Sequence, residues 1–123
     1  MERNRLQDIE VYRQHVFEGS SICTTYELLL RFVAKLRSDL PKRTDQYRVG
    51  NLSPGYMDYT YFAFYDEYLR SQQLRFGIVL NHHQMQFELW LMAQNAERQV
   101  FYWEKLKELE WNREKVAMPR YTV

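Results

Sequence analysis

Two adjacent histidines stand at the centre of the segment FGIVLNHHQMQFELWL and could in principle hold a metal ion. His82 and His83 would point to opposite faces of an extended chain, and no nearby Cys, Asp or Glu completes a ligand spacing. Cys23 is the single cysteine; it could be a nucleophile near a helix start, but packing as an apolar residue before a helix cap explains it better. We therefore predict no metal site and no cofactor, and interpret the two histidines as turn residues.

Two carboxylates, Asp58 and Glu88, are expected on strands, because each lies in a run rich in aromatic and β-favouring residues. Such a pair can hold a divalent cation, and metal-dependent nucleases of the restriction-endonuclease-like class place an Asp on one strand and a Glu-x-Lys on the next. Here Trp90 stands where that class has Lys. The nuclease-like hypothesis therefore lacks the third residue of its class.

The hairpin predicted from Leu74 to Met92 has one face that is less apolar than the other. The loop is either the two histidines or Asn81 to Gln84. In both cases Leu80 would pair with Met85 and Ile78 with Phe87 on the apolar face. The opposite face would pair Val79 with Gln86, Gly77 with Glu88 and Arg75 with Trp90, with Asp58 and Thr60 nearby on the preceding strand. The candidate binding residues are Asp58, Arg75, Gln86, Glu88 and Trp90. Three arrangements would explain this face. Its residues form structural pairs under a helix, with an ion pair between Glu88 and Arg75, or they line a pocket, or they form a dimer surface. Of these we expect structural pairing.

Other segments must position this hairpin. Apolar residues at helical spacing predict a helix from Leu6 to Gly19 and a second that starts at a Thr24 capping box and ends before Pro41. Extended segments at 47–49 and 56–65, a helical turn in 66–73 and a helix capped by Asn95 complete the set. The predicted fold is a single α+β domain, 1–123, with two N-terminal helices, an antiparallel sheet of three to four strands around the central hairpin, and a C-terminal helix packed on the sheet.

Composition and charge exclude several classes of protein. The hydrophobic fraction of 46% supports a real core, and a net charge of +1 provides no general field for nucleic acid, which is an unlikely partner. The basic run from Lys35 to Arg48 is interrupted by Asp39 and Asp45, so a solvated helix end explains it better than an RNA site. We see no membrane span and no signal peptide, and one cysteine suits a reducing compartment, so a cytoplasmic location is expected.

Three segments, GYMDYTYFAF, FGIVLNHHQMQFELWLMAQN and QVFYWEKLK, resemble a family of small, uncharacterised bacterial proteins with a domain of unknown function. The resemblance covers roughly Gly55 to Lys107 and rests on Gly-Tyr-Met-Asp, Asn-His and aromatic-Glu-x-Trp-Leu segments. It implies a soluble bacterial domain of similar length, and it supplies no reaction, cofactor or partner.

Two hypotheses about function follow. The first is a small, soluble, non-catalytic binding or assembly module that forms a homodimer, because 10 Tyr and 3 Trp occur in a chain without a catalytic signature. The second is a small-molecule-binding or catalytic pocket on the polar hairpin face, around Asp58, Arg75, Glu88 and Trp90. The sequence identifies no catalytic residue.

Overall fold

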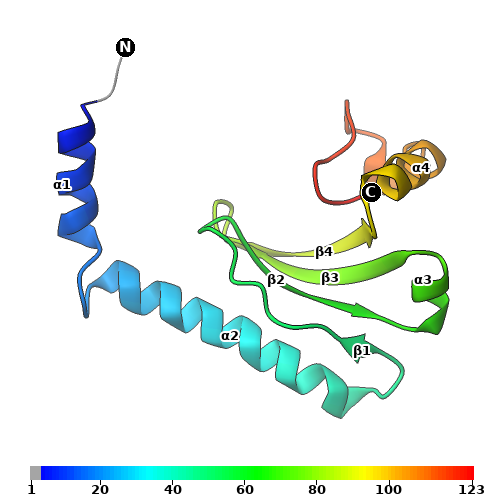
Figure 1. The fold of residues 1–123 in the computed structure, drawn as a ribbon, viewed down its shortest axis with the longest axis horizontal. Helices are drawn as coiled ribbons and strands as arrows, with labels where there is room; N and C mark the ends of the chain where they lie inside the picture. The colour runs from blue at the N-terminus through cyan, green and yellow to red at the C-terminus, as the bar shows by residue number, and fades with distance from the viewer. Residues whose placement is uncertain (1–3) are drawn as a thin grey trace.

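The computed structural model describes residues 4–123 and confirms the predicted α+β fold (Figure 1). Four strands form one antiparallel sheet in the order β1-β2-β3-β4, so each strand pairs with its neighbours in sequence. A short 3₁₀ helix at Glu110–Asn112 follows the last α-helix. The elements in chain order are α1 (Arg5–His15), α2 (Ser21–Arg43), β1 (Arg48–Val49), β2 (Tyr59–Tyr65), α3 (Glu67–Ser71), β3 (Leu74–Asn81), β4 (Gln86–Ala93) and α4 (Ala96–Leu106).

The core lies between α2 and one face of the sheet. Val33 of α2, Phe62 of β2 and Leu80 of β3 are buried together there, because the apolar stripe of a helix and the apolar face of a sheet each need a partner. The bounds of α2 correct two predictions. Its N-cap is Ser20, whose hydroxyl accepts from the Cys23 amide at 3.1 Å, and the helix continues past Pro41 to Arg43.

The hairpin of β3 and β4 has the predicted faces but a different register. Leu80 lies opposite Phe87 and Ile78 opposite Leu89, so β4 is displaced by two residues from the predicted pairing, and the loop is His82–Met85. Asn81 stabilises this longer loop, because its side-chain oxygen accepts from the amides of His83 and Gln84, each at 3.1 Å. A displacement of two keeps every side chain on its face, so the prediction was wrong in the loop and in the cross-strand partners but not in the faces.

The opposite face of the sheet lies toward α4 and the C-terminal segment (Figure 1). The Gln99 side chain of α4 donates to the Pro119 carbonyl at 2.7 Å and holds this segment in place. The Val123 amide and the Thr122 hydroxyl both donate to the Leu91 carbonyl at 2.9 Å, which fastens the segment to the free edge of β4.

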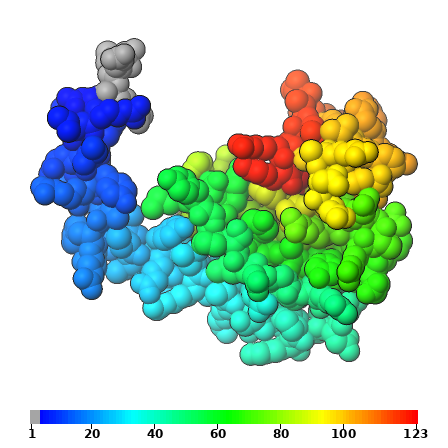
Figure 2. All heavy atoms as spheres, in the orientation of Figure 1, coloured from blue at the N-terminus to red at the C-terminus, as the bar shows by residue number. Residues whose placement is uncertain are grey.

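Helix α1 stands away from the rest of the molecule (Figure 2). None of its residues is buried, and it meets α2 through a bend in which Gly19 takes a positive φ of 81°. Within residues 4–123, no helix is long and apolar enough to cross a membrane.

Candidate functional site

A hollow of about 460 Å³ lies on the sheet face opposite α2 and includes three of the five predicted site residues, Asp58, Arg75 and Trp90. We call it the aromatic hollow. Its other walls come from β2, the start of α4 and the C-terminal segment. The additional residues that carry aromatic or polar groups into it are Ser53, Tyr56, Tyr59, Tyr61, Asn95, Gln99, Arg120 and Tyr121.

Three aromatic rings form one wall of the aromatic hollow. The Trp90 ring lies 4.9 Å from the Tyr59 ring, centroid to centroid, with the planes at 63°. It lies 6.0 Å from the Tyr121 ring, nearly parallel to it at 11°. The guanidinium of Arg120 sits over the Tyr121 ring at 5.0 Å. This arrangement presents ring faces and edges with a cation beside them, which suits flat, electron-rich partners.

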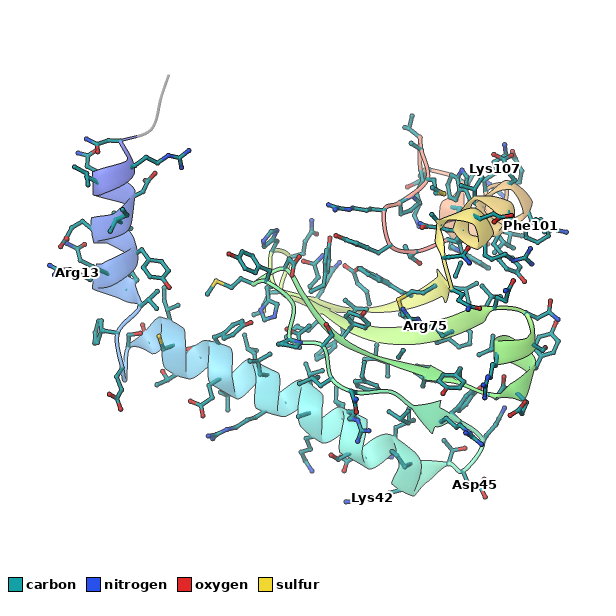
Figure 3. The ribbon with its side chains drawn as sticks, viewed as in Figure 1. Arg13, Lys42, Asp45, Arg75, Phe101 and Lys107 are labelled. Atoms are coloured by element: carbon teal, nitrogen blue, oxygen red, sulfur yellow. The ribbon has the colours of Figure 1, made fainter. Side chains whose placement is uncertain are left out.

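Arg75 does not pair with Glu88, so the prediction of that ion pair was wrong. In the observed register Arg75 lies opposite Met92, and Glu88 lies opposite Val79, four residues further along β3. Four residues of a strand span about 13 Å, beyond the reach of an ion pair. Arg75 is exposed, lies on the side of the sheet that faces α4 and the C-terminal segment (Figure 3), and forms no salt bridge with any residue in 4–123.

Glu88 instead holds its own strand and loop in place. Its carboxylate accepts from Asn81 Nδ2 at 2.9 Å, from Gln86 Nε2 at 2.8 Å and from the Trp90 indole Nε1 at 2.8 Å. Burial raises the pKa of this carboxyl, but the three donors together lower it below its usual value. The charged carboxylate therefore orients the Trp90 ring. Gln86 does not line the aromatic hollow and contributes a hydrogen bond to Glu88.

Asp58 closes the loop that enters β2. Its carboxylate accepts from the backbone amides of Tyr56 at 2.7 Å and Tyr59 at 2.6 Å, and these two bonds lower its pKa. Asp58 lines the aromatic hollow, whereas Glu88 lines a different hollow between β4 and the C-terminal segment. In residues 4–123, no three His, Cys, Asp or Glu side chains gather as metal ligands. Both carboxylates are occupied in holding the backbone and side chains around the aromatic hollow.

The comparisons with known proteins give one match. A model of the family described as a domain of unknown function (DUF7000) matches residues 6–123. The chain belongs to this family. The match confirms the resemblance to an uncharacterised domain family. No curated protein and no solved structure matches the chain.

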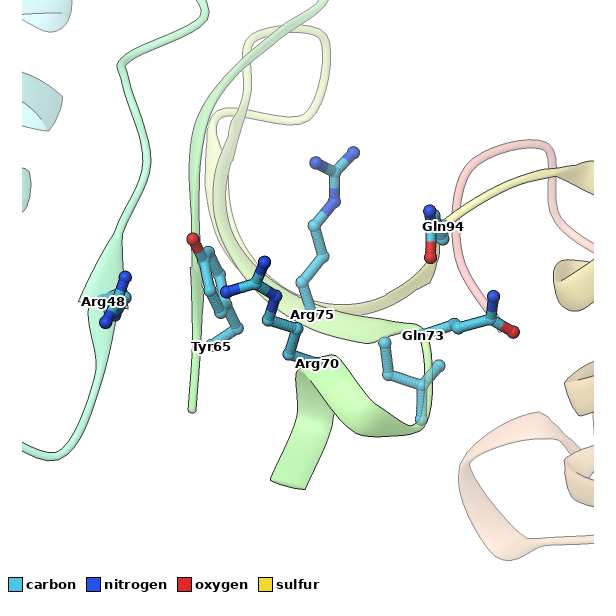
Figure 4. Close-up of a pocket in the computed structure, with 7 residues that line it drawn as sticks. Arg48, Tyr65, Arg70, Gln73, Arg75 and Gln94 are labelled. Carbon is cyan, nitrogen blue, oxygen red and sulfur yellow. The ribbon is translucent and has the colours of Figure 1, made fainter. Parts of the chain in front are cut away.

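A second hollow, of about 440 Å³, adjoins Arg75 in this DUF7000 chain and is lined by three arginines (Figure 4). We call it the arginine hollow. Arg48 comes from β1, Arg70 from α3 and Arg75 from β3, and none of them forms a salt bridge with a described residue. The remaining lining residues are Tyr65, Gln73, Leu74 and Gln94. Arg75 therefore borders both hollows.

Sequence reasoning missed several residues of these two hollows. Tyr59 and Tyr61 alternate along β2 on the face of Arg75, so strict alternation could have found them. Arg120 and Tyr121 arrive from the C-terminal segment, and Arg70 from a short helix; no periodic pattern places either segment against β3. Thr60, which was expected near the polar face, is buried on the α2 side of the sheet.

Buried Thr60 and half-buried His82 form a polar link behind the hairpin loop. The Thr60 hydroxyl donates to the Pro54 carbonyl at 2.7 Å, so its oxygen accepts from His82 Nε2, also at 2.7 Å. This link needs a proton on Nε2, and in the neutral imidazole it therefore selects the Nε2 tautomer. Burial lowers the pKa of His82 below its usual 6.5, with the nearby Asp58 charge opposing and His83 adding to the shift.

Acidification should therefore destabilise the fold through His82. Because the pKa of His82 is lower in the folded than in the unfolded chain, the unfolded chain takes up the proton first as the pH falls. The stability that neutral His82 contributes is therefore present above pH 6.5 and is lost as the pH falls through the folded pKa. Urea unfolding measures this change. From about pH 7.5 to about pH 5.5, the free energy of unfolding should fall more in wild type than in His82→Gln, whose amide can still donate to Thr60. The exposed His15→Gln on α1 is the matched control, because His15 takes no part in the shift of His82, and it should behave as wild type. Equal losses in all three proteins would contradict the assignment.

Proposed function

We propose that the chain is a non-catalytic assembly module that works as a cytoplasmic homodimer in bacteria. The supporting observation is a large set of apolar side chains exposed on α1, on the bend after it, on α2 and on β4. A cytoplasmic setting accords with the unpaired Cys23. The exposed residues concerned are Leu6, Ile9, Tyr12, Phe17, Leu28, Phe32, Phe87 and Leu89.

One part of this surface is a strip where α2 leaves β4 uncovered. The Phe32 and Phe87 rings lie 5.8 Å apart and join the helix to the strand. Leu28 precedes Phe32 by one helical turn, and Leu89 follows Phe87 on the same face of β4 with 64% of its side chain exposed. We call these four residues the α2–β4 strip. A strip of this kind on the core side of a sheet is typical of a surface that another element covers.

The other part is helix α1, none of whose residues is buried by the part of the chain that the structure describes. It has 11 residues, none of them buried, and Leu6 is 77% exposed. A helix this short is marginal in water without packing. The Asn4 side chain caps its first turn, accepting from the Leu6 amide at 3.0 Å, but a cap adds only about 1 kcal/mol. Contact with a partner would supply the missing packing.

A second copy of the chain would cover both parts at once. In a two-fold dimer, α1 of each protomer would lie on the α2–β4 strip of the other, so each surface is buried once per chain. The eight side chains expose on the order of 900 Å², at about 150–250 Å² for a free large apolar side chain. A stable interface buries about 800 Å² per partner, so the available area is sufficient.

Light scattering of the purified chain tests this proposal. We expect twice the mass of one chain for wild type, and monomers for Ile9→Lys in α1 and for Leu89→Lys in the strip. Each lysine should weaken the dimer about tenfold or more, because it places a charge in an apolar contact. Both side chains are exposed in the protomer, so neither change disturbs its core.

Two further measurements make the test specific. Val116→Lys is the matched control, because Val116 is fully exposed but lies outside this surface, and it should leave the mass unchanged. Mixing the Ile9→Lys and Leu89→Lys proteins should restore part of the dimer, since one α1–strip contact is then free of lysine. A monomeric wild type, or a dimer that survives both substitutions, would refute the proposal.

A further inference from the structure

We propose that the sheet face opposite α2 binds a small molecule that combines a flat aromatic ring with a phosphate or carboxylate group. The ring would lie in the aromatic hollow, and the acidic group would lie at Arg75, where the aromatic and arginine hollows meet. This site uses none of the eight apolar residues of the proposed dimer surface, so the two proposals are independent.

The ring-binding part rests on the side chains that are already fixed in place. Trp90 is oriented by its 2.8 Å hydrogen bond to Glu88, which is itself held by two further donors. Tyr121 is held by the C-terminal segment, which Gln99 and Leu91 anchor. A site whose aromatic walls are ordered before binding loses little side-chain entropy when a ring enters.

The acid-binding part rests on positive charge that no carboxylate within residues 4–123 pairs with. Arg48, Arg70, Arg75 and Arg120 line the two hollows, and none of them forms a salt bridge with residues 4–123. The carboxylates on this side are otherwise engaged, Asp58 by backbone amides and Glu88 by three side-chain donors. Guanidinium groups bind phosphate and carboxylate oxygens through paired hydrogen bonds, which makes an acid the matching ligand group.

The central position of Arg75 links the two parts. Its side chain rises from β3 between Gln94 on one side and Tyr65 with Arg70 on the other (Figure 4). It borders the aromatic hollow of about 460 Å³ and the arginine hollow of about 440 Å³. Each hollow falls within the usual range of about 300–1,000 Å³ for small-molecule sites, so a single ring with its acidic substituent fits. A net charge of +1 favours such a compact anion over a nucleic-acid chain.

Calorimetric titration with adenosine 5′-monophosphate, adenosine and inorganic phosphate separates the two requirements. We expect the monophosphate to bind at least about tenfold more tightly than either adenosine or phosphate, since only it uses both parts of the site. Binding should weaken as salt is added, because the arginines are exposed and screened. The same titration with indole-3-acetate and phenyl phosphate extends the test to other rings and to a carboxylate.

Substitutions then locate the site. Arg75→Gln should weaken binding of the monophosphate about tenfold or more, and Tyr121→Leu about fivefold or more. Arg113→Gln is the matched control, because Arg113 is exposed and lines neither hollow, and it should leave the affinity unchanged. Urea unfolding of each variant confirms that a lost affinity is not a lost fold.

Four results would overturn the proposal. The first is no binding of any ring-bearing acid at millimolar concentration. The second is equal binding of adenosine and its monophosphate. The third is an affinity unchanged in Arg75→Gln. The fourth is an affinity that rises steeply from the mononucleotide to longer single-stranded oligonucleotides, which would identify a nucleic-acid chain, rather than a small molecule, as the source of the phosphate.

Discussion

Replacing Phe62 with alanine is expected to lower the free energy of unfolding by about 3 to 5 kcal/mol. Phe62 has no exposed surface and lies at the centre of the cluster that joins α2 to the sheet, in contact with Val33 and Leu80. Alanine would remove the ring from a site that cannot collapse, because a helix and three strands surround it. The loss includes both the transfer of the ring to water and the cavity left behind.

Urea unfolding at one fixed protein concentration measures this change, since a dimer makes stability depend on concentration. Phe101→Ala is the matched control, because Phe101 lies on α4, outside this core and outside the proposed dimer surface, and is 41% exposed. It should cost clearly less than Phe62→Ala. Equal costs would mean that the core between α2 and the sheet is not centred on Phe62.

Replacing Gly55 with alanine is expected to cost about 2 kcal/mol or more and to disturb the aromatic hollow as well. Gly55 has a positive φ of 76°, and a Cβ there would run into the Tyr59 carbonyl oxygen and lie 2.9 Å from Asp58 Oδ1. Neither atom can move without breaking the loop that Asp58 closes through the amides of Tyr56 and Tyr59. The walls of the hollow that come from this loop would shift with it.

Gly19→Ala provides the comparison for Gly55→Ala. Gly19 has a similar φ of 81°, but nothing lies within 4 Å of a Cβ placed there. The free energy of unfolding of Gly19→Ala should therefore fall by only about 1 kcal/mol, the cost of holding alanine in a backbone conformation that glycine prefers. Unfolding of the two variants side by side measures the cost of the crowded loop. Equal losses would show that the Asp58 loop is looser than its hydrogen bonds indicate.

In the hairpin, the sequence predicted the faces of the strands but not their register. Alternation placed Arg75, Glu88 and Trp90 on one face correctly, because a strand has a period of two whatever its register. The register itself depended on the loop, and the side-chain bonds of Asn81 that stabilise a four-residue turn leave no periodic signal. The Arg75–Glu88 pair was predicted from the wrong register and fails for that reason.

The candidate site was only partly visible in the sequence for a related reason. Asp58, Arg75 and Trp90 could be placed because they lie on or beside predicted strands, whereas Arg120 and Tyr121 reach the hollow through contacts of an irregular segment with α4 and β4. Apolar spacing also predicted helix α1 but not its exposure, since Leu6, Ile9 and Tyr12 at helical spacing do not indicate which surface would cover them.

The sequential order of the strands has a consequence for how the chain folds. Each strand pairs only with its neighbours along the chain. The three connections are short: residues 50–58, residues 66–73, which contain α3, and the four-residue loop His82–Met85. Closing short loops costs little chain entropy, and topologies rich in local contacts fold fast. The β3–β4 hairpin can therefore form early and present Ile78 and Leu80 as a template for β2 and then α2. The C-terminal segment, whose partner Leu91 lies far back in the chain, would dock last and complete the aromatic hollow only when the sheet is already in place.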